Sequence, residues 1–387
     1  MPFFVHLLGL AVFAMGTSEF MLSGLVPGIA HDLGVSIPAA GQLTSAFAVG
    51  MIVGAPLTAV LSSRWPRRLA LLAFLGVFLA VHVVGAVTTS FGVLLATRVV
   101  GAVANAGFLA VALSAAAAMV APDKKARATS VLLGGVTAAC VAGVPAGAVL
   151  GEMWGWRSAF WAVALVSAPA FLAILKAAPV SRDGAPAGSV RGELASLRDR
   201  RLLVTLLLGA LVNGATFCAY TYLAPVVTGV AGLDAAWVPI VLALFGVGSF
   251  LGVTVSGRVA DARPGLLLVT GGTALPVGWA LFALTAGSPV ATVVLALVQG
   301  TLAFAVGSAL ISQVLYAGPP RLGGAFATAA FNVGAALGPW LGGLAIGAGH
   351  GFRAPLWVSA LLVAIALPVL IGRQAGMKSQ AADSPGV

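Results

Sequence analysis

Long, continuously apolar runs recur along the whole chain, and they constrain its fold more than any other feature of the sequence. Each run holds roughly twenty residues or more, enough for a helix rising 1.5 Å per residue to cross about 30 Å of hydrocarbon. The runs lack the polar–apolar alternation of barrel strands. We therefore predict an all-α membrane protein with twelve transmembrane helices, near residues 4–30, 36–61, 69–87, 91–120, 127–150, 158–176, 202–230, 237–257, 265–286, 289–316, 323–347 and 354–372.

The composition agrees with this prediction. Of 387 residues, 60% are hydrophobic and only 8% are charged, and the mean hydropathy is +1.09. Soluble domains carry about 25% charged residues. These values exclude a soluble enzyme, a disordered chain and a disulfide scaffold. We expect the first span to be retained, because the N-terminus lacks the basic segment of a cleavable signal and its apolar run is too long.

The basic residues gather on one side of the predicted membrane. A net charge of +10 would by itself suggest nucleic acid or an anionic surface as a partner. With the N-terminus placed inside, seventeen of the twenty Lys and Arg residues fall in inner segments, Arg157 and Arg353 in outer loops, and Arg98 in a span. This bias is typical of topology signals. We predict a cytoplasmic-membrane protein with both termini in the cytoplasm, surrounded by lipid and without a nucleic-acid partner.

The chain also divides into two similar halves. A polar segment, 177–201, separates residues 1–176 from residues 202–372, each predicted to be a six-helix bundle, and residues 373–387 form a predicted cytoplasmic tail. The segments 155–161 and 351–357 share the pattern glycine, aromatic, arginine, two residues, an apolar residue and tryptophan, 196 residues apart. Repeats of six spans are typical of transporters whose site lies between the halves.

Glu19 and Arg98 are the only charged residues placed well inside the spans. Because an ionisable group in hydrocarbon is costly, we expect Glu19 to face a cavity and carry protons. The alternative is a protonated Glu19 bonded to a neighbouring helix. The helical rise places Glu19 about 16 Å and Arg98 about 10 Å from the outer edge, so the two can share one cavity. Arg98 then either tunes Glu19, holds a polar substrate, or binds backbone carbonyls.

Uncharged side chains in the spans give weaker candidates for substrate contacts. Asn105 follows Arg98 by seven residues on the same helical face. Phe217 and Tyr220 are nearly one turn apart and form either an aromatic wall or core packing. For the amides, hydrogen bonding between helices is the alternative. For the isolated His82, packing and proton relay both remain open. The candidate contacts are Glu19, Gln42, Arg98, Asn105, Phe217, Tyr220, Gln299 and Asn332.

Enzymatic chemistry has no support in the sequence. No metal-ligand spacing or phosphate-binding loop appears, and the four histidines are scattered. We therefore expect no enzyme activity, no metal and no cofactor, with a proton gradient as the energy source.

Several motifs resemble the major facilitator superfamily. Residues 257–261 are similar to the start of its cytoplasmic loop motif, and the equivalent first-half loop keeps arginines but departs from the pattern at Ser63 and Pro66. Leu94 and Arg98 resemble its L-x-x-x-R motif. Residues 143–151 are a variant of the glycine–proline motif of the twelve-span drug:proton antiporter branch, and residues 334–343 match that motif fully.

Residues 16–27, and residues 40–43 with 54–56, resemble sugar and chloramphenicol exporters of this branch, and residues 127–157 look most like actinomycete chloramphenicol resistance transporters. This resemblance covers nearly the whole chain. It implies a monomer that exports a small drug, most of all chloramphenicol, in exchange for protons by alternating access. Sugar or nucleoside export is the alternative. The resemblance implies proton coupling for Glu19 and Arg98. It also implies conformational roles, beyond close packing and bends, for Arg64, Arg67, Arg68, Gly143, Pro145, Gly147, Asp261, Gly338 and Pro339.

Overall fold

The computed structural model describes residues 3–62, 65–121, 125–177, 198–260, 264–317 and 323–366. Within these ranges the chain is helical and contains no strand. Nine helices there are long and apolar enough to cross a membrane. The bent pair α1 (Phe3–Phe20) and α2 (Leu22–Leu33) makes a tenth if it is counted as one span. The protein is therefore a multi-pass membrane protein.

The helices of the first half follow the predicted apolar runs. After α1 and α2 come α3 (Ile37–Ser62), α4 (Arg67–Val87), α5 (Phe91–Ala118), α6 (Lys125–Ala138), the π-helix η2 (Ala139–Gly143), α7 (Val144–Trp154) and α8 (Arg157–Ala177). Local signals set their ends: Ser90 accepts a hydrogen bond from the Val93 nitrogen at the start of α5, and Gly155 ends α7 with a φ of 78°.

The helices of the second half begin beyond residue 198. They are α10 (Arg200–Thr221), α11 (Leu223–Gly229), α12 (Trp237–Ala260), α13 (Pro264–Thr285), α14 (Pro289–Ala317), α15 (Gly323–Ala345) and η4 (Ile346–His350), followed by the shorter apolar helix Ala354–Ala366. Asp199 caps α10, because its side chain accepts a hydrogen bond from the Arg201 nitrogen at 2.8 Å. Pro264 and Pro289 each begin a helix, where a missing N–H costs no helical hydrogen bond.

Three predicted spans are interrupted. The span 4–30 bends by 54° between α1 and α2, at Met21, and Glu19 lies just before this break. Pro27 has no N–H to continue the ladder of α2, and the Gly24 nitrogen bonds Met21 only three residues back. The span 202–230 breaks at Tyr222. In the span 127–150, the extra residue of η2 precedes Pro145, which cannot donate to the preceding turn.

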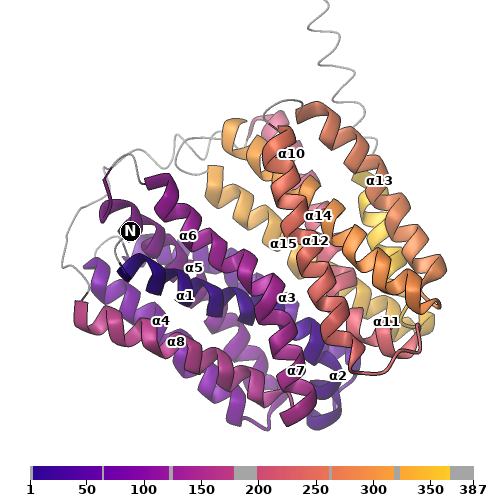
Figure 1. The fold of residues 1–387 in the computed structure, drawn as a ribbon, viewed down its shortest axis with the longest axis horizontal. Coiled ribbons are helices and arrows are strands. Elements are labelled where there is room, and N and C mark those ends of the chain that lie inside the picture. The colour runs from indigo at the N-terminus through magenta and orange to yellow at the C-terminus, as the bar shows by residue number, and fades with distance from the viewer. Residues whose placement is uncertain are drawn as a thin grey trace, which may run out of the picture.

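Buried apolar side chains form two main cores. One core consists of residues between Phe4 and Ile174, and the other is built almost entirely from residues between Leu208 and Ala366. Figure 1 shows the corresponding helices on two sides of the molecule. The two sides meet where α3 packs on α15, where η2 and α7 pack on α12, and where α2 packs on α11. Any site between the halves must lie along these contacts.

The internal repeat is visible in the contacts of glycines. A Cβ on Gly50 would touch the Val99 carbonyl, and a Cβ on Gly248 would touch the Leu297 carbonyl; both partners are shifted by 198 residues. The same shift relates the approach of Gly16 to Val136 and that of Gly214 to Gly334. Equivalent helix pairs in the two halves therefore touch at equivalent positions, because glycine lets the backbones approach closely.

Several predicted segments lie outside the described residues. These are Arg64, Asp261, residues 178–197 of the predicted linker, the end of the predicted twelfth span beyond 366, and the predicted tail 373–387. The described part of the linker shows that α8 continues to Ala177 and that α10 already begins at Arg200. Below, the end of the molecule where α10 begins is called the Arg200 end, and the opposite end is called the Arg157 end.

We predict that Gly334→Ala destabilises the protein. Its Cβ would strike the Ala210 carbonyl and lie 2.8 Å from the Gly214 nitrogen, and both are backbone atoms of α10 that cannot rotate away. Overpacking of this kind costs about 1–3 kcal/mol. The matched control is Gly134→Ala on α6, where a Cβ meets nothing within 4 Å. Thermal unfolding in mild detergent should show a lower midpoint for Gly334→Ala only. Equal midpoints for the two variants would contradict the close approach.

Candidate substrate cavity and charged pair

A cavity of about 340 Å³ lies between the two halves. The first half contributes residues of α6 and η2, and the second half contributes residues of α10, α12, α14 and α15. On each helix the lining residues lie near the middle of the span or between the middle and the Arg200 end, as Leu133, Val253 and Ile311 illustrate. The cavity thus occupies the part of the interface nearer the Arg200 end, in the size range of small-ligand sites.

The walls of the cavity are mostly apolar and carry no charged side chain. Three of the polar side chains in the lining donate a hydrogen bond to a backbone carbonyl. Thr216 donates to the Val212 carbonyl at 2.8 Å, Ser249 to the Gly246 carbonyl at 2.7 Å, and Asn213 to the Phe331 carbonyl at 2.7 Å. Their oxygens remain as acceptors. The cavity therefore suits a neutral ligand with an apolar body and N–H or O–H groups of its own.

An aromatic cluster closes the cavity toward the Arg157 end. Phe20 stacks on Phe217 with ring centroids 5.5 Å apart, and the ring centroids of Tyr220 and Phe245 are 4.7 Å apart. These four residues line a small hollow whose wall shares Cys140, Thr216, Ser249 and Phe304 with the cavity. The predicted pair Phe217 and Tyr220 thus lies beside the cavity, and Phe20 brings the neighbour of Glu19 into the same cluster.

Glu19 and Arg98 lie close together, but Arg98 binds the neighbouring residue, Ser18, and not Glu19. Glu19 is half-buried and interacts electrostatically with Arg98 and with the cavity residue Cys140. Arg98 is 1% exposed; its Nη1 donates to the Ser18 hydroxyl at 2.8 Å and its Nη2 to the Ser18 carbonyl at 2.7 Å. Among the described residues, no ion pair within 4.0 Å joins Glu19 and Arg98. The structure therefore places Glu19 and Arg98 at one level, with Glu19 near Cys140 of the cavity wall.

Four other predicted contacts lie away from the cavity lining. Gln299 is fully buried between α14 and α13, with its Nε2 3.5 Å from the Leu275 carbonyl. Asn332 donates to the Thr328 carbonyl of its own helix at 2.9 Å, and the Asn105 nitrogen lies 3.7 Å from the Met51 sulfur. Gln42 is half-buried on α3. Gln299 and Asn105 thus contact neighbouring helices, whereas Asn332 bonds within its own helix.

Comparison with known proteins identifies the family. A family model described as Major Facilitator Superfamily matches residues 8–328. The chain belongs to this superfamily. It is 57% identical over 374 residues to a chloramphenicol resistance protein of Streptomyces lividans, with 95% of each chain covered. It is also 34% identical over 367 residues to the inner membrane transport protein YdhP of Escherichia coli K12, with 93% of each chain covered.

A solved structure has the same fold. The crystal structure of a mutant of the nucleoside transporter NupG superposes with a TM-score of 0.75, covering 95% of this chain and 99% of that one. The identity is 14%, so this likeness concerns the fold alone. The protein is therefore a transporter of the Major Facilitator Superfamily, and its family indicates a carrier and not an enzyme.

The glycine–proline residues predicted from this superfamily lie where helices touch. A Cβ on Gly143 would strike the Thr17 hydroxyl on α1, and one on Gly338 would strike the Gly214 carbonyl on α10. Pro145 is the second residue of α7, and a Cβ on Gly147 would lie 3.5 Å from the Met21 side chain. The Pro339 carbonyl accepts a hydrogen bond from Tyr222 at 2.8 Å. These positions therefore bring α1 and α10, the helices that carry Glu19 and Phe217, close to their neighbours.

The predicted loop arginines lie at the Arg200 end. Arg67 begins α4, and Arg68 donates from its guanidinium to the Leu175 carbonyl near the end of α8. Arg68 therefore joins α4 to α8 in the first half.

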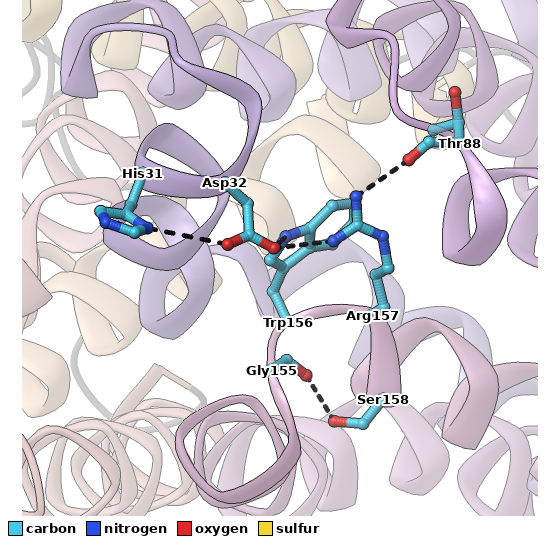
Figure 2. Close-up of polar contacts among 7 residues, drawn as sticks. All are labelled: His31, Asp32, Thr88, Gly155, Trp156, Arg157 and Ser158. Carbon is cyan, nitrogen blue, oxygen red and sulfur yellow. Dashed lines mark hydrogen bonds and ion pairs between the residues drawn. The ribbon is translucent and has the colours of Figure 1, made fainter.

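The repeated glycine–aromatic–arginine motif forms a polar cluster at the Arg157 end (Figure 2). One Asp32 oxygen accepts hydrogen bonds from Trp156 at 3.0 Å and from Arg157 at 2.7 Å. Arg157 also donates to the Thr88 carbonyl at 3.2 Å, and Ser158 donates to the Gly155 carbonyl at 2.7 Å. The cluster fastens α2, the end of α4 and the start of α8 together.

Sequence reasoning missed most of the cavity lining. Asn213, Thr216 and Ser249 are absent from the predicted contacts. Serine and threonine in membrane helices commonly bond the preceding turn, as both do here, so their sequence positions do not reveal which face they occupy.

We predict that Asp32→Ala destabilises the protein and that Asp32→Asn does so less. Alanine removes the acceptor of the buried Trp156 N–H, whereas the amide oxygen of asparagine keeps one. An unsatisfied buried donor costs about 1–3 kcal/mol. Thermal unfolding in detergent should rank wild type, Asp32→Asn and Asp32→Ala in falling order. Glu152→Ala, which changes an exposed acid on α7 near the same end, should match wild type. If Asp32→Ala also matches it, the cluster has no structural role.

Proposed function

We propose that this protein exports chloramphenicol, or a similarly small neutral molecule, in exchange for protons. The observation that carries the proposal is the uncharged, mostly apolar cavity of about 340 Å³ between the two halves, whose wall residue Cys140 interacts electrostatically with Glu19. The 57% identity to a chloramphenicol resistance protein supports the choice of substrate.

The proposal includes an architecture of twelve spans in two six-helix bundles. Ten spans are found by length and composition when the bent pair is counted. Helix α13, with 22 residues, and the helix Ala354–Ala366, which reaches the end of the described range, supply the remaining two. The two separate cores support a division at the linker. We expect one chain to be sufficient, because the cavity lies between its own two halves.

The charge pattern supports an orientation in the cytoplasmic membrane. Arg67, Arg68, Arg200 and Arg201 lie at the Arg200 end, whereas Arg157 lies at the opposite end. By the positive-inside rule the Arg200 end faces the cytoplasm, as do both termini. The cavity then lies toward the cytoplasm, where an intracellular drug would enter.

The lining favours chloramphenicol over a sugar. Chloramphenicol combines an aromatic ring with hydroxyl and amide N–H donors, which match the acceptor oxygens of Thr216, Ser249 and Asn213. A polyhydroxylated ligand would lose hydration at every hydroxyl left against the apolar walls. The family fold is shared with a nucleoside transporter, but fold does not determine substrate.

Glu19 supplies the coupling in this proposal. Protonation from outside releases the drug, and loss of the proton toward the cytoplasm restores affinity. With Glu19 as the one carboxylate placed well inside the spans, about one proton is coupled by carboxylate chemistry. A proton gradient is the only energy source required, and no cofactor takes part.

We predict that Glu19→Gln abolishes drug-driven proton movement. Glutamine keeps the size and hydrogen bonding of a protonated Glu19 but cannot lose the proton. In vesicles, addition of chloramphenicol should move protons in wild type and not in Glu19→Gln. The matched control, Glu152→Gln, makes the same change at an exposed site on α7 and should behave as wild type. Coupling that survives in Glu19→Gln would refute the assignment.

We also predict that Thr216→Val weakens drug binding about fivefold, the value of one hydrogen bond of about 1 kcal/mol. Valine preserves the shape of threonine and removes its acceptor. Thr254→Val is the matched control, because Thr254 makes the same bond to its own helix, at 2.8 Å to the Phe250 carbonyl, outside the cavity lining. Equilibrium binding of chloramphenicol to purified protein measures both Kd values. Equal Kd values for the two variants would place the drug elsewhere.

A further inference from the structure

His82 does not stand alone in the structure, although it is isolated in the sequence. The side chain is 2% exposed on α4, and its Nδ1 lies 2.7 Å from the Phe78 carbonyl. A carbonyl only accepts, so this nitrogen carries a hydrogen. In the neutral ring Nε2 is then an acceptor, and it lies 2.7 Å from the Ser18 hydroxyl. Ser18 therefore donates to His82.

The Ser18 hydroxyl in turn accepts from Arg98. Because its own hydrogen points to His82, its lone pairs face the guanidinium, whose Nη1 lies 2.8 Å away. The Ser18 carbonyl accepts a hydrogen bond from the second terminal nitrogen of Arg98, Nη2, at 2.7 Å. All these hydrogen bonds run in one direction, from Arg98 through Ser18 to His82 and on to Phe78. One neutral residue thus binds both terminal nitrogens of a buried cation.

This arrangement leaves Arg98 able to bind elsewhere. Its Nε is buried and has no hydrogen-bond partner among the described residues, and the guanidinium carbon lies 4.5 Å from the centre of the Phe47 ring. The Glu19 carboxyl, on the residue next to Ser18, attracts it electrostatically. Without the Ser18 hydroxyl, the strongest available partner for Arg98 is the Glu19 carboxylate.

We propose that Ser18 and His82 are positioning residues that hold Arg98 off Glu19, so that the Glu19 carboxyl stays free to exchange its proton and respond to substrate. The inference rests on the proposed function. His82 orients the Ser18 hydroxyl, the hydroxyl binds Arg98, and Arg98 remains near Glu19 without forming an ion pair with it. Loss of either positioning residue lets Arg98 pair with Glu19, which favours the charged carboxylate.

The charged and titratable groups around Glu19 come from four other elements. Arg98 on α5 and Cys140 on η2 interact electrostatically with Glu19 on α1, and His82 on α4 interacts with Arg98. Tyr220 on α10 interacts with Cys140. Of these, Arg98 alone is a permanent cation, so its position controls the charge of Glu19.

The test measures drug-triggered proton release from purified, full-length protein in detergent with a pH indicator dye, over a range of pH. We expect the midpoint of release to move toward acid by about one pH unit or more in Ser18→Ala and in His82→Leu, the usual effect of a cation close to a carboxylate. The double variant should move it no further, because both changes break one chain. His82→Gln should stay near wild type, since its amide oxygen can accept from Ser18.

The control is Ser167→Ala, another fully buried serine, which donates to the Val163 carbonyl on α8 at 2.8 Å and lies outside the chain of bonds. It should not move the midpoint. The inference is overturned if Ser18→Ala and His82→Leu lower only stability or amplitude and keep the wild-type midpoint, or if their effects add. If wild type releases no protons on addition of chloramphenicol, the proposed function is wrong, and the inference that rests on it is wrong as well.

Discussion

A guanidinium buried in a membrane protein must find acceptors within reach of its fixed fork, and this requirement organises the centre of the first half. Arg98 meets it through the hydroxyl and the carbonyl of a single residue, Ser18. That residue immediately precedes Glu19 and lies three residues before the break between α1 and α2. The position of the cation, the freedom of the acid and the bend of the first span are therefore linked through two adjacent residues.

Close backbone contacts hold this centre against the rest of the protein. Gly16 and Gly143 let α1 and η2 approach, so that Cys140 lies near both Glu19 and the cavity. In the second half, Gly214 and Gly334 bring α10 against α15 in the same way. The halves are alike in these contacts but differ in polar content. The first carries Glu19 and Arg98, the charged residues well inside the spans, and the second carries most of the cavity wall. Such a division suits a carrier that couples proton exchange in one half to ligand contacts in the other.

The residues that were predictable are those whose chemistry is rare in hydrocarbon. Glu19 and Arg98 stood out because a charge in a span is costly, and the helical rise alone placed them at similar depth. Phe217 and Tyr220 line the small hollow beside the cavity and are also buried in apolar clusters, so their contact with substrate stays a prediction. Gln299 and Asn332 show the limit of this reasoning. An amide in a span can form its hydrogen bonds equally well to a ligand, to a neighbouring helix or to its own helix. Here both side chains donate to backbone carbonyls.

The sequence by itself determined the helical membrane fold, the positions of the spans and the charged pair, because hydropathy and charge act locally and repeat along the chain. Only the tertiary structure decided which side chains share the cavity and which partner holds Arg98. Those outcomes depend on helix bends and rotation, set by contacts such as Gly143 with Thr17 and His82 with Ser18, between residues far apart in the chain. A run of apolar residues predicts that a helix is buried in lipid, but the packing of its neighbours decides which face it turns inward.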